Sequence, residues 1–339
     1  MTAFDAILLV SFGGPEGPDD VVPFLENVTT GRAIPQERLE EVAAHYRHFN
    51  GISPINEQCR RIRAALDEAL ASAGHDLPVY WGNRNWYPFL SDTVAQMAID
   101  GVGRALAIVT SAYSSHSSCR QYLDDIDRAR DEVGATAPPI EKVRAYHDHP
   151  EFIAEFISAT QAAQRELGEV GAGAPLVFTS HSLPVAAAAT CDYQAQLIET
   201  AGLVVAGLPD DVEWSLAWQS RSGPPEVPWL APDINDELHR LASTGVKAAI
   251  VVPIGFVSDH MEVVWDLDIE AMATARRLGI RAVRAATPGT EPSNALIAMY
   301  VDLIEERLTG RSERASIGKL GIRPDRCPPG CCPPPPSSR

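Results

Sequence analysis

A histidine and three spaced carboxylates are the residues of this chain best suited to proton and metal chemistry. His181 directly follows a short apolar run, in the segment TSHSLP. Glu262, Asp266 and Glu270 recur at intervals of four residues, so a helix places them along one stripe. A neutral imidazole beside a file of carboxylates can bind a divalent cation or carry protons away from a substrate.

Both features also have a structural interpretation. A lone histidine at a strand end is often a hydrogen-bonded structural residue, and on spacing alone the two interpretations of His181 carry about equal weight. Charges on a helix commonly form a solvated face, but the apolar residues at 261 and 263–265 favour a partly buried stripe. Asp259 is expected to cap this helix.

The six cysteines are distributed unevenly. Three are scattered and three crowd into the tail CPPGCCPPPP: Cys59, Cys119 and Cys191, then Cys327, Cys331 and Cys332. The first residues, MTAFDAILLVSFGGP, lack the basic region and cleavage site of a secretory signal, so we expect a cytoplasmic protein. Crowded cysteines in that compartment favour a metal or cluster site over a disulfide framework.

Composition excludes several classes of protein. The chain has 339 residues, with 28 Lys and Arg against 45 Asp and Glu, giving a net charge of −17. A protein that tracks phosphates needs a basic stripe, so neither nucleic acid nor an anionic membrane surface is an expected partner. No apolar stretch approaches the roughly 18 residues of a transmembrane helix, and none is expected. The partner is expected to be a small molecule or a cation.

Short apolar runs alternate with amphipathic segments along most of the chain, which predicts strands separated by helices. The strands are expected at 6–11, 77–81, 105–110, 142–146, 176–180, 214–218, 248–253 and 281–285. The helices are expected at 35–48, 56–73, 92–99, 120–132, 151–167, 192–202, 235–243, 262–278 and 293–308. This alternation predicts an α/β fold of two similar doubly wound, Rossmann-like domains with parallel four-stranded sheets.

The two halves are expected at 1–145 and 146–310, with the last helix packing back on the first half, followed by a Cys- and Pro-rich tail at 311–339. Polar loops follow the strands in both halves: SFGGP, SAYSSHSSC, TSHSLP and PIGFVSDH. Because ligands bind at the carboxyl ends of parallel strands, these loops are expected to line a cleft between the halves.

Two further patterns concern the ligand. The loop SFGGPEGP matches neither GxGxxG nor GxxxxGK[ST], so its glycines favour close approach of a flat ligand over nucleotide binding. The segments YWGNRNW and WQSRSGPPEVPW are either core packing or a wall that stacks on a planar macrocycle.

Seven motifs carry a family resemblance over about the first 310 residues. In chain order they are SFGGP, NGISPIN, YSSHSSCRQY, TSHSLP, WQSRSGP, PWL and PIGFVSDHMEVVWDLD. They resemble the ferrochelatases, type II chelatases that insert Fe²⁺ into a porphyrin without ATP. The resemblance implies a lyase of heme biosynthesis with the type II chelatase fold, and with a porphyrin and ferrous iron as substrates.

The resemblance assigns roles to the residues that could do chemistry. His181 matches the family's histidine near the metal and the pyrrole nitrogens, and we favour it as the proton acceptor. Glu262 matches the acidic residue that faces it across the macrocycle. Asp266 and Glu270 match an outward line of carboxylates that binds or relays the hydrated metal.

The resemblance also implies substrate contacts. Tyr46, Ser53 and Tyr122 match residues that contact porphyrin propionates, and Arg32 is a candidate loop cation. Phe12 stands where many relatives have a tyrosine above the metal, so a tyrosinate-bound product is not expected. Related enzymes can have an arginine at the position of His45.

Some ferrochelatases carry a [2Fe–2S] cluster on one internal cysteine and three near the C-terminus. This implies cluster ligands at Cys119, Cys327, Cys331 and Cys332, where the last two can both ligate if the chain turns sharply between them. Cys59 and Cys191 are then expected to be structural thiols.

Soluble ferrochelatases of the actinobacterial type act on coproporphyrin III to give coproheme, which is the expected reaction, with protoporphyrin IX as the alternative substrate. A cobalt or nickel chelatase of another tetrapyrrole and a non-enzymatic iron or cluster carrier are the competing functions. A His/Glu metallohydrolase is disfavoured because the chain lacks HExxH. We expect a monomer that meets another enzyme of heme biosynthesis transiently.

Overall fold

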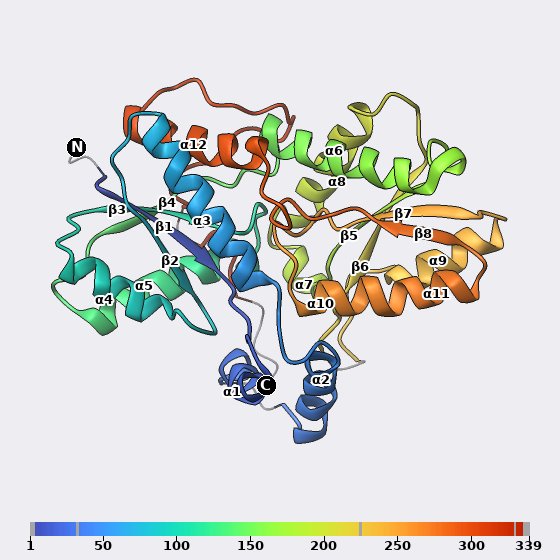
Figure 1. Cartoon of the computed structure of the whole chain (residues 1–339), viewed down its shortest axis with the longest axis horizontal. Coiled ribbons are helices and arrows are strands. Elements are labelled where there is room, and N and C mark those ends of the chain that lie inside the picture. The colour runs from blue at the N-terminus through green and yellow to red at the C-terminus, as the bar shows by residue number, and fades with distance from the viewer. Residues whose placement is uncertain (1–3, 32–33, 224–225, 329, 335–339) are drawn as a thin grey trace.

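A computed structural model describes residues 4–31, 34–223, 226–328 and 330–334. Within these residues the strands form two parallel four-stranded sheets, ordered β2-β1-β3-β4 and β6-β5-β7-β8 (Figure 1). The strands are β1 Ala6–Ser11, β2 Val79–Asn83, β3 Ala105–Val109, β4 Ile140–Lys142, β5 Leu176–His181, β6 Trp214–Gln219, β7 Ala248–Val252 and β8 Arg281–Arg284. The predicted fold of two parallel four-stranded sheets is confirmed.

Both sheets have the same strand order, although the sequence shows no convincing repeat. In each, the first strand of the half lies between its two successors, so β1 pairs with β2 and β3, and β5 pairs with β6 and β7. The winding of the chain reverses between these central strands, which is where open α/β sheets bind their ligands. The loops after β1, β3, β5 and β7 therefore lie at the two positions best suited to a site.

Helices flank both sheets. They are α1 Val21–Thr29, α2 Gln36–His48, α3 Ile55–Ser72, α4 Leu90–Ile99, α5 Gln121–Val133, α6 Pro150–Leu167, α7 Val185–Ala188, α8 Tyr193–Ala206, α9 Ile234–Ser243, α10 Met261–Val263, α11 Met272–Arg277 and α12 Asn294–Thr309. Helix α12 contacts α3 and α6, while α1 and α2 project from the lower edge of the molecule in Figure 1.

Helices α1 and α7 were not predicted. Pro23 lies near the start of α1, and the preceding segment GPEGPDD has the composition of a loop. A proline in the first turn costs little because the amide that it lacks has no partner there. The apolar face of α1 buries Val21, Phe24 and Leu25.

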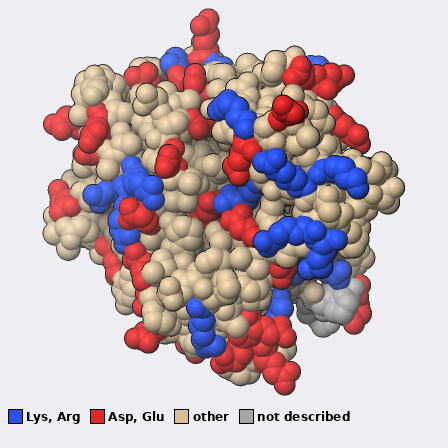
Figure 2. Space-filling model, turned by 45° about the vertical axis from the view of Figure 1, so that its right-hand side comes forward, with Lys and Arg blue, Asp and Glu red and all other residues tan. Residues whose placement is uncertain are grey.

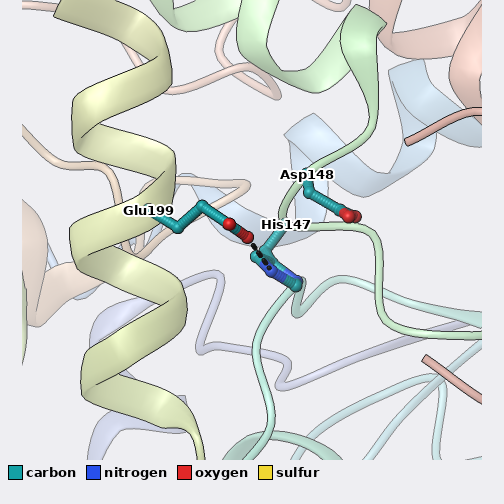
Figure 3. A group of neighbouring side chains, drawn as sticks. All are labelled: His147, Asp148 and Glu199. Carbon is teal, nitrogen blue, oxygen red and sulfur yellow. Dashed lines mark hydrogen bonds and ion pairs between the residues drawn. The ribbon is translucent and has the colours of Figure 1, made fainter. Parts of the chain in front are cut away.

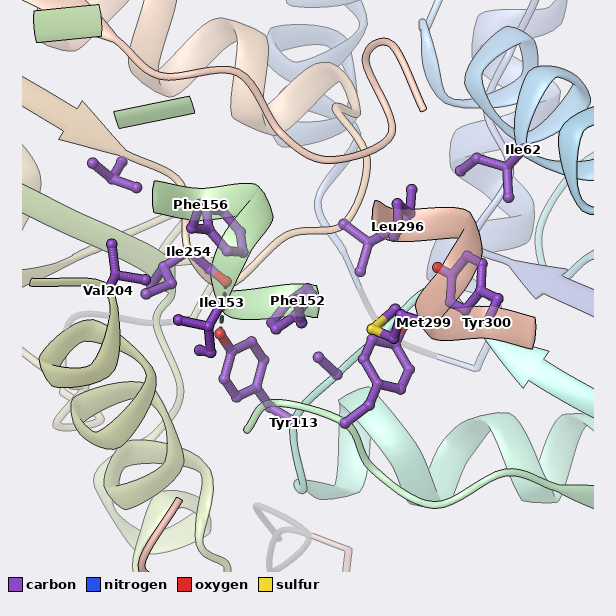
Figure 4. Packing of buried hydrophobic residues seen from close by; sticks show 14 of the residues in the cluster. Ile62, Tyr113, Phe152, Ile153, Phe156, Val204, Ile254, Leu296, Met299 and Tyr300 are labelled. Atoms are coloured by element: carbon purple, nitrogen blue, oxygen red, sulfur yellow. Dashed lines mark hydrogen bonds between the residues drawn. The ribbon is translucent and has the colours of Figure 1, made fainter. Parts of the chain in front are cut away.

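The largest apolar core joins the two sheets (Figure 4). Phe152 and Phe156 of α6 lie in one buried cluster with Tyr300 of α12 and with Tyr113, which follows β3. Tyr113 donates a hydrogen bond of 2.8 Å to the carbonyl of Ile254, which follows β7. Each fully buried large side chain contributes roughly 1.5–3 kcal/mol, so this shared core holds the two halves together.

The predicted strand 142–146 is wrong for most of its length, because β4 ends at Lys142. The following residues, Val143 to Tyr146, are buried, but they join the two halves instead of continuing the sheet. Tyr146 donates its hydroxyl to the carbonyl of Val109, and Arg144 pairs with Glu306 of α12. A short apolar run indicates burial without distinguishing a strand from a buried connection.

The helix expected over 262–278 is composite. It begins as α10, continues as a π-helix over Val264–Ala271 and ends as α11. Its cap is His260, whose Nδ1 accepts from the amide of Glu262 at 3.2 Å. The prediction that Asp259 caps it is wrong, because that carboxylate pairs with Arg284 at 3.0 Å. π-Helical turns are rare and occur frequently at functional sites.

The surface carries charges of both signs. In Figure 2 the Lys and Arg side chains gather mainly on the right of the face drawn, while Asp and Glu dominate its lower edge. The charges are therefore spread unevenly over this face. In the described part of the chain, no helix is long and apolar enough to cross a membrane.

Candidate functional site

His181 closes β5 with one ring nitrogen committed to the backbone. Its Nδ1 lies 2.6 Å from the carbonyl oxygen of Ser182, which can only accept. Nδ1 therefore carries the proton of the neutral ring, and Nε2 presents a lone pair. Nε2 lies 3.7 Å from Oε2 of Glu262. Both side chains reach solvent, with 32% of His181 and 48% of Glu262 exposed.

Close backbone packing fixes the end of β5. Gly255, in the loop after β7, donates its amide to the carbonyl of Thr179 at 3.1 Å. A Cβ at Gly255 would lie 1.9 Å from Oγ of Ser180, so the loop after β7 approaches the end of strand β5 this closely only because residue 255 is a glycine. Ser180 in turn hydrogen-bonds the hydroxyl of Tyr193 at 2.5 Å. The strand end that carries His181 is therefore rigid.

His260 is a member of the site that the sequence analysis did not assign. Its Nδ1 lies 4.0 Å from Oε2 of Glu262, and its ring lies 5.2 Å from Phe256 and 6.3 Å from Phe12. Burial lowers the pKa of His260, so its ring is held neutral. The capping preference for short polar side chains indicated the neighbouring Asp259 instead, so the sequence held no direct signal for His260.

The loop after β1 supplies the opposite side of the group. The ring of Phe12 lies 6.3 Å from that of Phe24 and 5.7 Å from the guanidinium of Arg84. The same guanidinium lies 4.7 Å from the ring of Tyr122 and pairs with Asp125. Arg84 belongs to the aromatic segment YWGNRNW, which the sequence analysis singled out without assigning the arginine a role.

Ser53 and Tyr46 pack around this loop. A Cβ at Gly14 would lie 2.7 Å from Oγ of Ser53, so the two loops are in direct contact. Tyr46 on α2 is 6% exposed, and its ring lies 5.7 Å from that of Phe24. Burial, followed by the charge of Glu262, raises the pKa of Tyr46. The tyrosine is therefore a neutral hydrogen-bond donor near the carboxylate.

Asp266 is the carboxyl whose acidity is most changed. Burial, with the neighbouring charges of Glu262 and Glu270, raises its pKa to about 7, although it accepts a hydrogen bond from Ser220. Ser220 has φ of +57°, a left-handed conformation that costs a non-glycine residue energy. The hydroxyl that reaches Asp266 is thus held by a strained backbone at the end of β6.

Glu270 lies at the outer end of the carboxylate file and is exposed. It accepts a 2.8 Å hydrogen bond from the indole of Trp265, on which the ring of His45 stacks at 3.9 Å. Burial lowers the pKa of His45, while Glu270 acts in the opposite direction. Helix α2 thereby packs against the π-helix through His45 and Trp265. His45 occupies the position at which related enzymes can have an arginine.

The structure brings most of the predicted site residues together. Contacts connect Phe12, Tyr46, Ser53, Tyr122, His181, Glu262, Asp266 and Glu270 through a few intermediate side chains. Arg32 lies outside the described residues. The cysteines predicted to bind a cluster form a separate group.

That group joins the tail to the first half. Cys119 lies in a π-helical segment, His116–Arg120, and its thiol contacts those of Cys327 and Cys332. Cys331 contacts Cys327, and its Sγ lies 3.7 Å from that of Cys332. Cys332 has φ of +49°, so the sharp turn that would let both adjacent thiols face one site is present.

The remaining two cysteines make no contact with these four thiols through a hydrogen bond, although the charge of Cys331 reaches Cys191. Cys59 on α3 is fully buried, and burial raises the pKa of its thiol to about 12. The thiol of Cys191 donates to the carbonyl of Ala188 at 3.5 Å. Both environments suit inert thiols.

Comparison with known proteins agrees with this geometry. The chain is similar to a coproporphyrin III ferrochelatase of Nocardia farcinica, with 50% identity across 98% of this chain and 97% of that one. A ferrochelatase of Rhodopirellula baltica is 48% identical across 97% of this chain and 93% of its own length.

Solved structures show the same fold at low identity. SirB from Bacillus subtilis with Fe³⁺ superposes with a TM-score of 0.54 at 12% identity, covering 90% of this chain and 97% of that one. CbiX, described as the terminal enzyme of siroheme biosynthesis in denitrifying bacteria, gives 0.52 at 15% identity, with 89% of this chain and 99% of that one covered. The ferrochelatase family model matches residues 4–308, and the chain belongs to the ferrochelatase family.

Proposed function

We propose that this protein inserts Fe²⁺ into coproporphyrin III and releases coproheme and two protons. The name of the Nocardia farcinica relative supports this substrate, as does that of a Mycolicibacterium smegmatis relative, 50% identical across 93% of both chains. The observation that carries the chemistry is the pairing of His181 with Glu262, because it sets an unprotonated ring nitrogen 3.7 Å from a carboxylate.

His181 is the proton acceptor in this proposal. Two pyrrole N–H protons must leave as iron enters, and Nε2 is the nitrogen free to take them because Nδ1–H is held by Ser182. The resulting imidazolium is stabilised by Glu262. Nε2 returns to its neutral form when the proton passes to this carboxylate.

The carboxylate file then carries the proton outward. Asp266 suits this role because its pKa of about 7 lets it accept and release a proton near neutral pH. Glu262, Asp266 and Glu270 also offer the oxygen ligands that a hydrated divalent cation can exchange for water. Phe12 has no ligand atom, so the loop after β1 supplies no phenolate to the product iron from this position.

We assign the substrate contacts from the family resemblance and from the position of the contacting residues around the loop after β1. Tyr46, Ser53 and Tyr122 surround the loop after β1 and offer hydroxyl groups to propionates, and Arg32 offers a cation. Arg84 lies against Tyr122 and orients its ring. Four propionates need more polar partners than two, which favours coproporphyrin III over protoporphyrin IX.

Anaerobic incubation with Fe²⁺ and each porphyrin tests the reaction. Coproporphyrin III should show the Soret shift of metallation with a higher kcat/KM than protoporphyrin IX, and His181→Ala should lower the rate at least about 100-fold. His239→Ala, at an exposed position on α9, is the matched control. Unchanged turnover in His181→Ala would refute the mechanism, while a preference for protoporphyrin IX or for Co²⁺ would refute the substrate.

We further propose that Cys119, Cys327, Cys331 and Cys332 hold a [2Fe–2S] cluster. Four thiols are the usual donor set of such a cluster, and the 3.7 Å between the sulfurs of Cys331 and Cys332 is close to the ~3.7 Å between two thiolates at bonds of about 2.3 Å on one tetrahedral metal. A bound cluster would supply one-electron chemistry, and its ligands would tie the tail to the first half of the molecule.

Visible absorption of the anaerobically purified protein tests the cluster independently of turnover. The protein should be coloured, should give the electron paramagnetic resonance signal of a reduced [2Fe–2S] centre after dithionite, and should lose both in Cys332→Ser. Cys191→Ala should keep both. A colourless wild-type protein with the iron content of a metal-free chain would refute this proposal.

A further inference from the structure

A second group of metal-ligating side chains lies away from the residues discussed so far. His147 and Asp148 follow β4, and Glu199 lies on α8 (Figure 3). One ligand atom from each residue lies within 4.8 Å of the other two. His147 and Asp148 are 0% and 1% exposed, and the side chain of Glu199 is 11% exposed. We propose that these three residues bind a first-row divalent cation, such as Zn²⁺.

An unpartnered polar atom points to a missing ligand. Oδ1 of Asp148 is buried and has no hydrogen-bond partner among the described residues. A buried polar atom without a partner loses its hydrogen bonds to water and gains none in return, so such atoms are rare in native proteins. A cation that binds this carboxylate oxygen replaces the bonds that it has lost.

The local charge also requires a cation. Two carboxylates meet one imidazole, and a lone pair on a ring nitrogen completes a mixed nitrogen and oxygen donor set. Arg144 is the cation nearest to Asp148, at 3.8 Å. Its Nε and Nη2 donate to the carboxylate of Glu306, at 2.9 Å, and to the carbonyl of Ala315. Its Nη1, the atom nearest Asp148, donates to the carbonyl of Ala145 at 3.2 Å.

The distances suit a first-row ion. Nε2 of His147 lies 3.2 Å from Oε2 of Glu199. Two ligand atoms of a tetrahedral zinc ion with bonds of about 2.0–2.1 Å lie roughly 3.4 Å apart. One imidazole and two carboxylates form a donor set that Zn²⁺, Fe²⁺ and Mn²⁺ accept, while Ca²⁺ and Mg²⁺ prefer oxygen alone.

The C-terminal tail covers this group directly. The backbone amides of Lys319 and Leu320 donate to Oε1 of Glu199, and Ser316 donates to Asp148. A Cβ at Gly318 would lie 2.4 Å from Oε2 of Glu199, so the approach requires glycine. Each carboxylate thus uses one oxygen to hold the tail and keeps another for the ion. The cation would be a structural clasp that anchors the tail ahead of its three cysteines.

Zinc stoichiometry tests the clasp in the full-length protein. The wild type, dialysed against a chelator and then against Zn²⁺, should retain one zinc ion per chain more than His147→Ala or Glu199→Gln, measured by inductively coupled plasma mass spectrometry. Zinc bound by the cysteines or near His181 is present in the wild type and in all variants, so it does not affect the difference in zinc content between them. His239→Ala should retain the wild-type amount. Equal zinc content in folded Glu199→Gln, judged by circular dichroism, would overturn the proposal.

Hydrogen exchange of the wild type gives a second measurement that depends on no variant. Zn²⁺ should slow the exchange of the amides of Lys319 and Leu320 at least tenfold, because the ion holds the carboxylate that accepts from them. The amides of α4, distant from the group in Figure 1, should exchange at an unchanged rate. Exchange at residues 319 and 320 that does not respond to Zn²⁺ would overturn the proposal.

Discussion

At the scale of single residues, hydrogen bonds and burial determine which atoms can move protons. The carbonyl of Ser182 fixes the tautomer of His181 at 2.6 Å, and the amide of Glu262 fixes that of His260 at 3.2 Å. The two rings therefore differ: Nε2 of His181 is an acceptor facing Glu262, while Nδ1 of His260 is already used as a helix cap. This difference favours His181 over His260 as the proton acceptor.

Asp266 gives the clearest prediction about pH. Its carboxyl holds a proton up to a pH of about 7 in the folded state, compared with 3.8 ordinarily, so the folded state binds more protons between these values. Stability is therefore lost as the pH rises through this window. Asp266→Asn should raise the free energy of unfolding by roughly 1–2 kcal/mol at pH 8 and by much less at pH 4.

Urea denaturation of the two proteins at both pH values measures this difference. A gain that is equal at pH 4 and pH 8 would show that the carboxyl is not held protonated. Iron insertion should meanwhile decrease in Asp266→Asn, because an amide cannot relay a proton.

At the scale of secondary structure, the sequence predicted the helices and strands far better than the segments that connect them. The helices 151–167 and 235–243 and the strand 6–11 lie within one residue of the observed bounds, because the helices have a strong apolar period and the strand is a short continuous apolar run. The strand predicted at 142–146 is wrong because burial there comes from contact between the two halves. The π-helix over Val264–Ala271 was missed because the spacing of its apolar residues does not distinguish it from an α-helix.

The site residues also divide into those that the sequence indicated and those that only tertiary contacts reveal. The motif of His181 and the spacing of Glu262, Asp266 and Glu270 were visible in the sequence. The positions of Ser220 and Arg84 depend on a left-handed backbone and on a cation–π contact, respectively. Neither leaves a periodic signal, so only three-dimensional structure reveals them.

The contact between the loop after β7 and the end of strand β5 can be tested by adding one methyl group at Gly255. Gly255→Ala should destabilise the fold by about 1–3 kcal/mol, because the added Cβ would lie 2.9 Å from Cα of Ser180, which is backbone and cannot rotate away. Iron insertion should fall with it, because Ser180 precedes His181. Thermal unfolding and turnover measure the two effects.

Gly202 on α8 provides the control, because a Cβ there meets nothing within 4 Å. Gly202→Ala should stabilise the protein by roughly 0.5–1 kcal/mol, as expected when alanine replaces glycine within a helix. If Gly255→Ala had the same stability and turnover as Gly202→Ala, the packing of the loop after β7 against strand β5 would not position His181.

At the scale of the whole molecule, the halves are joined by polar as well as apolar contacts. The shared core includes Phe152 and Tyr300, and beside it Arg144 pairs with Glu306 of α12 through two bonds of 2.9 Å. Arg144 also donates to Ala315, at the start of the tail. One buried arginine thus connects the segment after β4, the last helix and the tail that carries the cysteines.

Removing one partner of this pair should cost more than removing both. Arg144→Met leaves the carboxylate of Glu306, which is 1% exposed, with only the more distant Arg314 at 3.9 Å, and should destabilise the protein by about 3–5 kcal/mol. The double variant Arg144→Met/Glu306→Leu should recover most of that loss, because two apolar side chains can fill the buried volume. Guanidinium denaturation of the wild type, both single variants and the double variant measures the coupling. Additive single losses would mean that the pair does not act as a unit, and the two halves would then depend on the apolar core alone.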